Sequence, residues 1–418
     1  MVSFAALRDA DPTALKAAAD DWVSLARHCE QSAADIYRRG SSALDDSWKD
    51  AVGDLAVDRL ADLANSYQVA GLTIRGVAMT LEGLGEAAET TKRALLAAVD
   101  YARVNGLTVD EATGRAYYAQ AGPYTDDQVR AHALANTLIG EALTSAARID
   151  QEASAELAAL AGATENTSVD EANRYQSSAA RNQLDLYREA LPIGQGAEAV
   201  RAWWDALSPR DRAEFERAVP VELHDLDGIP EEVKDRLRGD NGYNAVEAVR
   251  WARENWDDLE TDRFEDNCAN FVSHTLHQGG GLPMKTDAFG GTLNGENWAS
   301  DAGTGIDGID RYAYLNTPSW AQAETQRQFF LDNGGQEVPL SEARPGDVVY
   351  WVQEGGGHTP VGQAHHAAVV TGVTPDGDVH YTQHTDPAID ESLNGGTAAY
   401  DLSAGQQRVV VVRPRQTW

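Results

Sequence analysis

Apolar residues in the first third of the chain recur every three or four positions, the period of one face of an α-helix. The first stripe follows Asp11-Pro12, which supplies an N-cap carboxylate and a proline in the first turn. It contains Leu15, Ala19, Trp22, Ala26, Cys29, Ala33 and Ile36. The pattern breaks between Gly40 and Trp48 and resumes over residues 60–98. Since neither helix can bury its stripe alone, the two are predicted to pair as a hairpin or to join a bundle.

The next part of the chain is also predicted to be helical. A helix start at residues 122–127 precedes a stripe of Val129, Leu134, Leu138, Leu143, Ile149, Leu157 and Leu160. From about Gly162 to Asn182 large apolar residues become rare, as in a linker or a loosely held helix. Ser208-Pro209 is a further helix start. We therefore predict an α-helical hairpin or bundle over residues 1–162 and a helical connector over 163–240.

The hydrophobic period changes to two in the last part of the chain. Helices are predicted after Asn244 and from an N-cap near Asp266, and the second ends at the glycines 279–281. Strands are predicted at residues 348–352, 367–371, 379–384 and 409–412, where β-branched residues follow turn residues. The predicted class is multidomain: an all-α N-terminal part, followed by an α+β domain with an antiparallel sheet at residues 241–418.

Composition narrows the partners and the compartment. The formal net charge of −32 argues against nucleic acid and anionic lipid, because both bind basic surfaces. Only Cys29 and Cys268 are present, so no disulfide framework is expected, and Cys29 on the first stripe is predicted to be a core residue. No signal peptide and no run of 18 apolar residues is found. We expect no membrane insertion, and a cytoplasmic location or export without a cleaved signal.

Cys268 is the first candidate for catalysis. It follows a polar turn and opens a helix-patterned run, which places its thiol in the first turn of a helix. The helix dipole and unpaired N–H groups of a first turn favour a thiolate and could hold an oxyanion. Further along the chain, His365-His366 opens a β-branched strand. A thiol on a helix and an imidazole on a strand are the parts of a cysteine hydrolase.

Residues 241–418 resemble the bacterial putative amidase domain, a branch of the papain-like cysteine hydrolases related to CHAP amidases. The matching phrases are Tyr243-Asn244, Cys268-Ala269-Asn270-Phe271-Val272-Ser273, Gly280-Gly281-Leu282-Pro283-Met284, Asn297-Trp298, Ser319-Trp320, Pro345-Gly346-Asp347-Val348-Val349, His366-Ala367-Ala368-Val369-Val370 and Gln383-His384-Thr385. Several phrases in one order are more specific than a lone motif. The resemblance implies a papain-like fold and hydrolysis of an amide bond, with cell-wall peptides as the usual substrate.

The resemblance also implies roles for individual residues. Cys268 would be the nucleophile, and His366 its general base, because it directly precedes Ala-Ala-Val-Val. Neighbouring strand residues point to opposite faces, so His365 is expected at the surface. The group that orients the imidazole is expected to be His384, with the alternatives Asp386 and Gln383.

Four further residues are candidates for binding substrate or an oxyanion. Asn267 stands where the family usually has aspartate, and Asn270 matches a family position that supports the helix and the site walls. Trp298 and Trp320 could line a substrate groove, although tryptophan in a domain of this size is more often a core residue. Residues 286–316 are predicted to form a wall or lid, or a plain surface loop.

A metal centre is not predicted. His358, His380, His384 and Cys268 could in principle bind zinc, but ligand pairs of the CxxC or HExxH kind are absent from the sequence. No other cofactor motif is found, so the predicted chemistry needs no cofactor.

Residues 5–105 resemble the WXG-type helical hairpins that actinobacteria export through type VII secretion. The resemblance rests on the hairpin with Trp48 in its connecting turn. Asp50 stands where the family has glycine, with Gly53 three positions later, and Asn105 stands where the export signal would have an acid after Tyr101. The resemblance implies a type VII-like export route and a helical secretion partner.

The predicted function is a cysteine-dependent amide hydrolase, delivered or docked by the helical part and acting on a peptide or peptidoglycan-type substrate. A toxin effector with an immunity protein and an enzyme that remodels the producer's own wall are both consistent with it. The same residues could also deamidate side chains or transfer acyl groups. The alternative is a binding or delivery protein whose hairpin is the working part and whose hydrolase fold is inactive.

Overall fold

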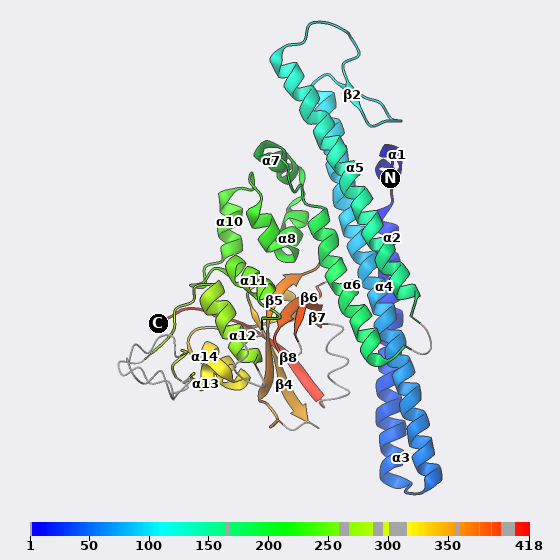
Figure 1. The fold of residues 1–418 in the computed structure, drawn as a ribbon, viewed down its shortest axis with the longest axis vertical. Coiled ribbons are helices and arrows are strands. Elements are labelled where there is room, and N and C mark those ends of the chain that lie inside the picture. The colour runs from blue at the N-terminus through cyan, green and yellow to red at the C-terminus, as the bar shows by residue number, and fades with distance from the viewer. Residues whose placement is uncertain are drawn as a thin grey trace. The chain divides into compact units, whose positions relative to one another are not determined.

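The computed structural model describes residues 2–163, 167–258, 267–286, 296–300, 316–355, 359–375, 377–385, 387–393 and 406–418. They form two units, Met1–Phe215 with Leu226–Ile229 and Glu216–Asp225 with Pro230–Trp418. The first unit is almost wholly helical, and the second combines helices with an antiparallel sheet (Figure 1). This confirms the predicted class of an all-α part followed by an α+β part. The predicted connector 163–240 is divided between the two units.

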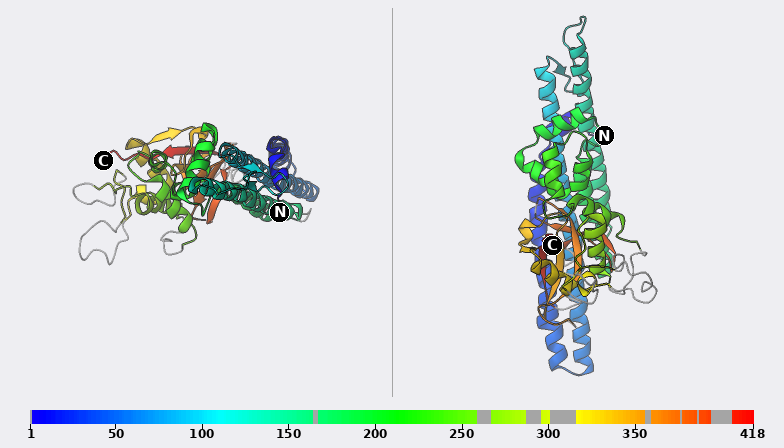
Figure 2. Two further views of the ribbon diagram at one scale, coloured as in Figure 1. Left: turned by 90° about the horizontal axis from the view of Figure 1, so that it is seen from above. Right: turned by 90° about the vertical axis from the view of Figure 1, so that its left-hand side faces the viewer.

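The first unit is built on two long antiparallel helices. After the short α1 (Phe4–Arg8), α2 (Pro12–Asp35) continues through η1 (Ile36–Ser41) and α3 (Ser42–Ser47), and α4 (Ala51–Val104) returns beside it (Figures 1 and 2). Asp11 caps α2 by accepting the Thr13 N–H at 3.2 Å. Asp50 caps α4 by accepting the Val52 and Gly53 N–H groups at 2.9 Å. The predicted pairing of two helices is present, and the predicted start of the first helix at Asp11-Pro12 is confirmed.

The stretch expected to be a linker is a packed helix. α5 (Asp126–Ala161) and α6 (Val169–Glu189) both lie against α4. The buried side of α6 includes the small residues Ala172, Ala179 and Ala180. A Cβ at Gly83 of α4 would lie only 3.0 Å from the Leu186 side chain. α6 is therefore buried because its small residues allow it to approach α4 closely. A regular stripe of large apolar residues, the usual sequence signal of a buried helix, is not needed.

Small elements complete the first unit. They are a two-stranded ladder of β1 (Thr108–Val109) and β2 (Ala116–Tyr117), which the sequence did not predict, followed by α7 (Ala197–Ala206) and the greater part of α8 (Pro209–Ala218). The predicted start of α8 is confirmed, because Ser208 Oγ accepts the Asp211 N–H at 3.2 Å.

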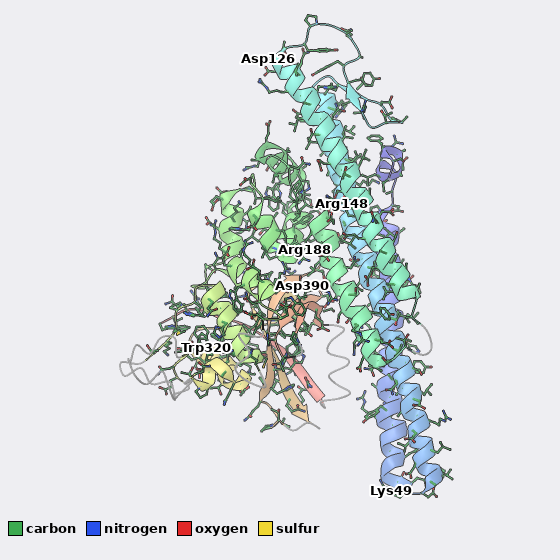
Figure 3. All side chains as sticks on the ribbon, viewed as in Figure 1. Lys49, Asp126, Arg148, Arg188, Trp320 and Asp390 are labelled. Atoms are coloured by element: carbon green, nitrogen blue, oxygen red, sulfur yellow. The ribbon has the colours of Figure 1, made fainter. Side chains whose placement is uncertain are left out.

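The buried stripe of α2 is narrower than the sequence suggested. Ala19, Ala26, Cys29 and Ala33 are buried, as predicted. Trp22, expected on the same stripe, is 39% exposed. Lys49 marks the tip of the hairpin in Figure 3, and Trp48 beside it is also exposed. A Cβ on Gly53 would lie 2.3 Å from the Trp48 carbonyl oxygen, so only glycine fits there without a shift of the turn.

The second unit packs helices on one face of a six-stranded antiparallel sheet of strand order β3-β8-β4-β5-β6-β7. Its helices are α9 (Pro220–Asp225), α10 (Glu231–Arg238), α11 (Ala245–Glu254), α12 (Cys268–His274) with η3 (Thr275–Gly279), α13 (Pro318–Ala321), α14 (Ala323–Asp332) and the short η5 (Leu340–Glu342). Its strands are β3 (Gln336–Val338), β4 (Val348–Gly355), β5 (Ala364–Val373), β6 (Val379–Gln383), β7 (Ala388–Ser392) and β8 (Gln406–Arg413). The four predicted strands are β4, β5, β6 and β8; β3 and β7 were not predicted.

The two faces of this sheet are distinct. On the helix-covered face, Tyr350, Ala367 and Val369 share one core cluster with residues of α11, α12 and α14. On the opposite face, Trp351 and Tyr381 belong to a second cluster. Alternate strand residues point to opposite sides, so cluster membership shows which face a side chain occupies.

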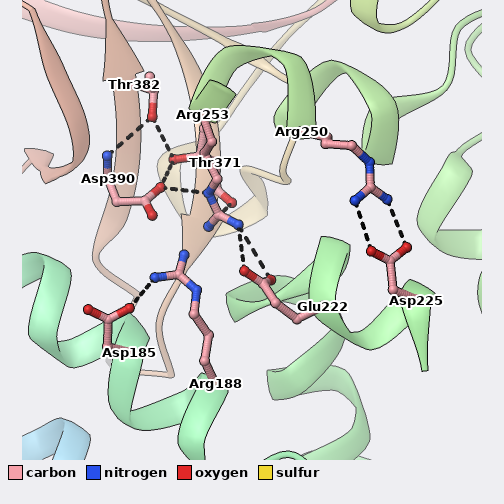
Figure 4. A network of polar contacts seen from close by, with 9 residues as sticks. All are labelled: Asp185, Arg188, Glu222, Asp225, Arg250, Arg253, Thr371, Thr382 and Asp390. Atoms are coloured by element: carbon pink, nitrogen blue, oxygen red, sulfur yellow. Dashed lines mark hydrogen bonds and ion pairs between the residues drawn. The ribbon is translucent and has the colours of Figure 1, made fainter. Parts of the chain in front are cut away.

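A buried ionic network joins the strands β5–β7 to the helices of the second unit (Figure 4). Asp390 of β7 is 2% exposed and accepts from Arg253 Nε at 3.0 Å and from the Thr371 hydroxyl at 2.6 Å. Arg253 of α11 also binds Glu222 of α9 at 3.1 Å. Asp390 has a φ of 49°, in the left-handed region. The carboxylate therefore holds β7, β5 and two helices in one arrangement.

Candidate functional site

Cys268 lies at the start of α12, as the sequence predicted. Its side chain is 5% exposed and belongs to the cluster on the helix-covered face, with Tyr350 and Ala367 of the sheet. Asn267 occupies the N-cap position of α12. The N-cap expected at Asp266 lies outside the described residues. The thiol is therefore placed where the first turn of a helix meets the sheet.

A chain of hydrogen bonds fixes the residue before the thiol. Trp320 Nε1 donates to Asn270 Oδ1 at 2.8 Å, and Asn270 Nδ2 donates to Asn267 Oδ1 at 2.9 Å. The Asn267 backbone N–H donates to Thr385 Oγ1 at 2.7 Å. Because its Oδ1 is used in this way, the Asn267 amide turns its NH₂ group toward the end of β6. Asn267 and Asn270, both candidates from the sequence, thus form one structural unit at the helix start.

His384 lies against this same helix start. Asn267 Nδ2 is 3.4 Å from His384 Nδ1, and the Phe271 ring centroid is 5.7 Å from that of His384. The next residue, Thr385, has a φ of 66°, which is rare for a β-branched residue. Such backbone strain concentrates at functional sites. It turns the chain at the end of β6 so that the Thr385 hydroxyl reaches α12.

His366 occupies a different place. It pairs directly with Trp351 across the β4–β5 ladder, and the two ring centroids are 4.9 Å apart. Its Nε2 is 2.7 Å from Gln383 Oε1. Directly opposed residues share a face, so His366 lies on the Trp351 side of the sheet, whereas Cys268 packs on the helix-covered side. Of the three candidates for the group that orients His366, Gln383 lies within hydrogen-bond distance of its imidazole. Asp386 lies outside the described residues.

A bulge explains this register. The ladder pairs Trp351 with His366 and Val352 with Ala364, so His365 is the extra residue. His365, expected at the surface, is half-buried, and burial lowers the pKa of its imidazole. The sequence suggests that side chains at this end of β5 alternate strictly between the two faces of the sheet. The bulge inserts one extra residue and so shifts this alternation by one position.

The two candidate groove tryptophans are core residues. Trp298 and Trp320 are fully buried, and Trp320 is labelled in Figure 3 among the helices of the second unit. Their ring centroids lie 4.7 Å apart. Trp298 Nε1 donates to Ser273 Oγ at 3.0 Å, as Trp320 does to Asn270. Both side chains therefore hold α12 in place through hydrogen bonds to Ser273 and Asn270. Such buried rings do not line an open substrate groove.

Sequence reading missed two polar residues beneath α12. Gln326 of α14 donates to the Ala269 carbonyl at 2.8 Å and to Ser273 Oγ at 2.7 Å. The Tyr350 hydroxyl donates to Gln326 Oε1 at 3.0 Å. Burial raises the pKa of the Tyr350 phenol well above its ordinary value, so it stays a neutral donor. Neither residue belongs to a family phrase, and only the fold brings them to the helix.

The described residues contain neither a group of metal ligands nor a membrane-spanning helix. Within the described ranges no three His, Cys, Asp or Glu side chains are grouped as a metal site would need. His380 Nδ1 lies 3.2 Å from the Asp390 carbonyl oxygen, and His358 is outside the described residues. Most of the predicted lid, 287–295 and 301–315, is also outside them. None of the helices described here is long and apolar enough to cross a membrane.

The comparison with known proteins bears on the second unit. Residues 242–404 match the family described as "putative amidase domain". This match supports a C-terminal amidase domain and, at the level of the family, an amidase-type hydrolase. No curated protein and no solved structure matches the chain.

Iodoacetamide at neutral pH is expected to label Cys268 at least about tenfold faster than Cys29. Burial and the neighbouring Glu30 raise the pKa of the Cys29 thiol, which lowers its thiolate fraction. Cys268 occupies the first turn of a helix, where a thiolate is favoured. Peptide mass spectrometry over time measures both rates in one sample. Equal, slow labelling would count against a reactive Cys268.

Proposed function

We propose that the second unit is a cysteine-dependent amide hydrolase with Cys268 as its nucleophile. The observation that carries the proposal is the position of this thiol, in the first turn of α12 and against the sheet, within the segment that matches an amidase family. The Cys268 thiolate attacks the amide carbonyl, the amine leaves with a proton from a histidine, and water hydrolyses the thioester. The chemistry needs no cofactor.

Two buried histidines are candidates for the general base. The family resemblance favours His366, and the Gln383 contact supports it by fixing the tautomer: Nε2 donates to Oε1 and leaves Nδ1 as the basic nitrogen. The geometry of the helix start favours His384, which lies beside Asn267. The proposal requires one of them, and substitution of each separates the two.

The proposed substrate is an amide bond in cell-wall peptide, which follows from the resemblance of residues 241–418. Full-length protein is incubated with bacterial sacculi, and released fragments are identified by mass spectrometry. New peptide or amide cleavages, absent after alkylation of Cys268, are the expected result. Release that survives alkylation would exclude the thiol mechanism. A reactive thiol without release would replace cell-wall peptide by another amide, and products with a new acid or acceptor would indicate deamidation or acyl transfer.

Gln383→Glu is expected to move the acidic limb of the pH profile of kcat/KM upward by about one unit. A carboxylate beside His366 Nε2 stabilises the imidazolium, so the base is protonated at a higher pH. Gln383→Leu, which keeps the volume and loses the acceptor, is expected to lower kcat by about 10- to 100-fold. An unchanged profile for Gln383→Glu would show that His366 does not act as the base.

A specific observation favours the alternative, a binding or delivery function of the helical unit. Large apolar side chains are exposed along α2, α4 and the turn between them: Trp22, Leu25, Tyr37, Trp48, Val52, Leu55, Leu63 and Tyr67. Exposed large apolar side chains are found at interaction sites, and these eight all lie between residues 22 and 67 of the hairpin. In this alternative the hairpin binds a helical partner, as the resemblance to WXG-type secretion proteins implies. The protein would then be exported without a cleaved signal, and an immunity protein could be a second partner.

Leu55→Glu with Leu63→Glu tests this alternative without touching the second unit. The charges are expected to abolish binding to a helical partner while leaving sacculus hydrolysis unchanged. A chain that binds its partner but never hydrolyses an amide, and whose Cys268 is inert, would favour the binding function over the enzyme.

A further inference from the structure

We infer that Gln326 of α14 is a positioning residue for the Cys268 thiol. Its side chain is 0% exposed and lies against α12, the helix that carries the thiol. Gln326 stands outside the phrases that resemble the amidase family, so the resemblance assigns it no role. The inference rests on the proposed function, because it concerns the nucleophile of that reaction.

Both ends of the Gln326 carboxamide are hydrogen-bonded. Its Nε2 donates to the Ala269 carbonyl at 2.8 Å and to Ser273 Oγ at 2.7 Å. Its Oε1 accepts from the Tyr350 hydroxyl at 3.0 Å. Ala269 and Ser273 lie about one turn apart on α12, and Tyr350 belongs to β4. Gln326 therefore ties the start of the thiol-bearing helix to the sheet.

The bond to the Ala269 carbonyl bears on the thiol itself. Ala269 directly follows Cys268, and its carbonyl belongs to the same peptide unit as the Asn270 N–H. The N–H groups of a first turn point toward the start of the helix, where the thiol is attached. A hydrogen bond to a peptide carbonyl polarises the peptide and makes its N–H a stronger donor. Gln326 is thus expected to hold this turn in place and to favour a thiolate there.

Tyr350 connects the same hydrogen bonds to the thiol from the sheet. Tyr350 and Cys268 belong to one core cluster. Burial raises the pKa of the Tyr350 phenol well above its ordinary value, and the charge of a Cys268 thiolate raises it further. The phenol is therefore a neutral donor within electrostatic range of the sulfur. Since its proton is donated to Gln326, a change at either residue is expected to act through the other.

The test measures the acidity of the Cys268 thiol in a Gln326→Leu variant of the full chain. The rate of alkylation by iodoacetamide is followed by peptide mass spectrometry from about pH 5 to about pH 9, and the pH of half-maximal rate is the alkylation midpoint. Leucine keeps the approximate volume and removes both polar ends. We expect the midpoint to rise by at least about half a pH unit, because the first turn loses a polarising donor.

Gln328→Leu is the matched control. Gln328 is an exposed glutamine of the same helix, and its Nε2 donates to Glu324 at 2.9 Å and not to α12. The same substitution there should leave the alkylation midpoint unchanged. Equal midpoints for a folded Gln326→Leu variant and for the control would overturn the inference.

A double-mutant cycle with Tyr350→Phe separates positioning from a general loss of stability. Tyr350→Phe removes only the hydroxyl that Gln326 accepts from, so it should raise the midpoint less than Gln326→Leu does. The double variant should match Gln326→Leu alone, because residues in one hydrogen-bond network are not additive. Summed effects would overturn the link through Gln326. Circular dichroism verifies folding, and if Gln326→Leu does not fold, an unchanged midpoint in Tyr350→Phe overturns the inference.

Alkylation needs no amide substrate, so this result does not depend on hydrolysis of sacculi. A raised midpoint in a protein that cleaves no amide would uphold the role of Gln326 toward the thiol while the proposed function fails. Where hydrolysis is found, Gln326→Leu should lower kcat with little change in KM, since the position of the nucleophile changes and the binding of substrate does not.

Discussion

Cys268→Ala is expected to lower kcat/KM for amide hydrolysis by about 10⁴-fold or more, because removal of a nucleophile eliminates the covalent route. The fold should survive, since alanine is smaller than cysteine and equally apolar. The matched control is Cys29→Ala, because Cys29 is also a buried helical cysteine, 7% exposed against 5% for Cys268. The prediction is checked by measuring kcat/KM of both variants on a soluble amide substrate that contains the bond cleaved in sacculi. Comparable activity of the two variants would refute the thiol mechanism.

The histidine variants complete this experiment. His366→Ala or His384→Ala should match the loss seen for Cys268→Ala, and the other should retain a measurable fraction of the activity. A dominant effect of His366→Ala would assign the base to His366 and would contradict its position on the Trp351 side of the sheet. A dominant effect of His384→Ala would assign the base to the histidine beside Asn267. Substantial activity in both variants would contradict the Cys–His proposal.

Asp390→Ala is expected to destabilise the sheet of the second unit by about 3–5 kcal/mol, because it leaves Arg253 without one of its buried partners. It also places alanine at a left-handed φ of 49°. Asp390→Asn should cost less, because it keeps an acceptor for the Thr371 hydroxyl and tolerates this φ. Hydrogen exchange of the β5, β6 and β7 amides measures the local free energy of opening.

The matched control is Asp225→Ala, which also removes the carboxylate partner of an α11 arginine. Asp225 binds Arg250 at two distances of 2.8 Å (Figure 4), but its side chain is 49% exposed. Exposed ion pairs contribute at most about 1 kcal/mol. If Asp390→Ala cost no more than Asp225→Ala, the buried network would not be what holds β7 in place.

Strong local patterns could be predicted from the sequence. The helices α2 and α4 were predicted because their apolar residues repeat regularly, and the start of α2 also because Asp11 is a capping residue. The start of α4 at Ala51, capped by Asp50, was not predicted. β4, β5 and β8 were predicted because each contains consecutive β-branched residues, and β6 because it follows the turn at residues 375–378. β3 and β7 are short, and they form only because neighbouring strands offer hydrogen-bonding edges. α6 lacked a large apolar stripe, and its burial depends on the glycines of α4.

In the candidate site, too, local patterns could be predicted from the sequence but contacts between distant segments could not. Cys268 could be placed at a helix start from its flanking residues alone. The face occupied by His366 could not, because the bulge at His365 depends on how β4 and β5 pair. The contact of Asn267 with Thr385 joins residues 118 positions apart, and no local pattern reveals it.

The position of β8 has a consequence for the order of synthesis. This strand follows all the other described strands in sequence, yet it lies between β3 and β4 in the sheet. Until residue 413 has left the ribosome, β3 has no neighbour and β4 lacks one of its two partners. Domains otherwise tend to fold from the N-terminus as they emerge. The helical unit can therefore form while the thiol-bearing unit is still incomplete, which would keep a hydrolase inert until β8 has been synthesised.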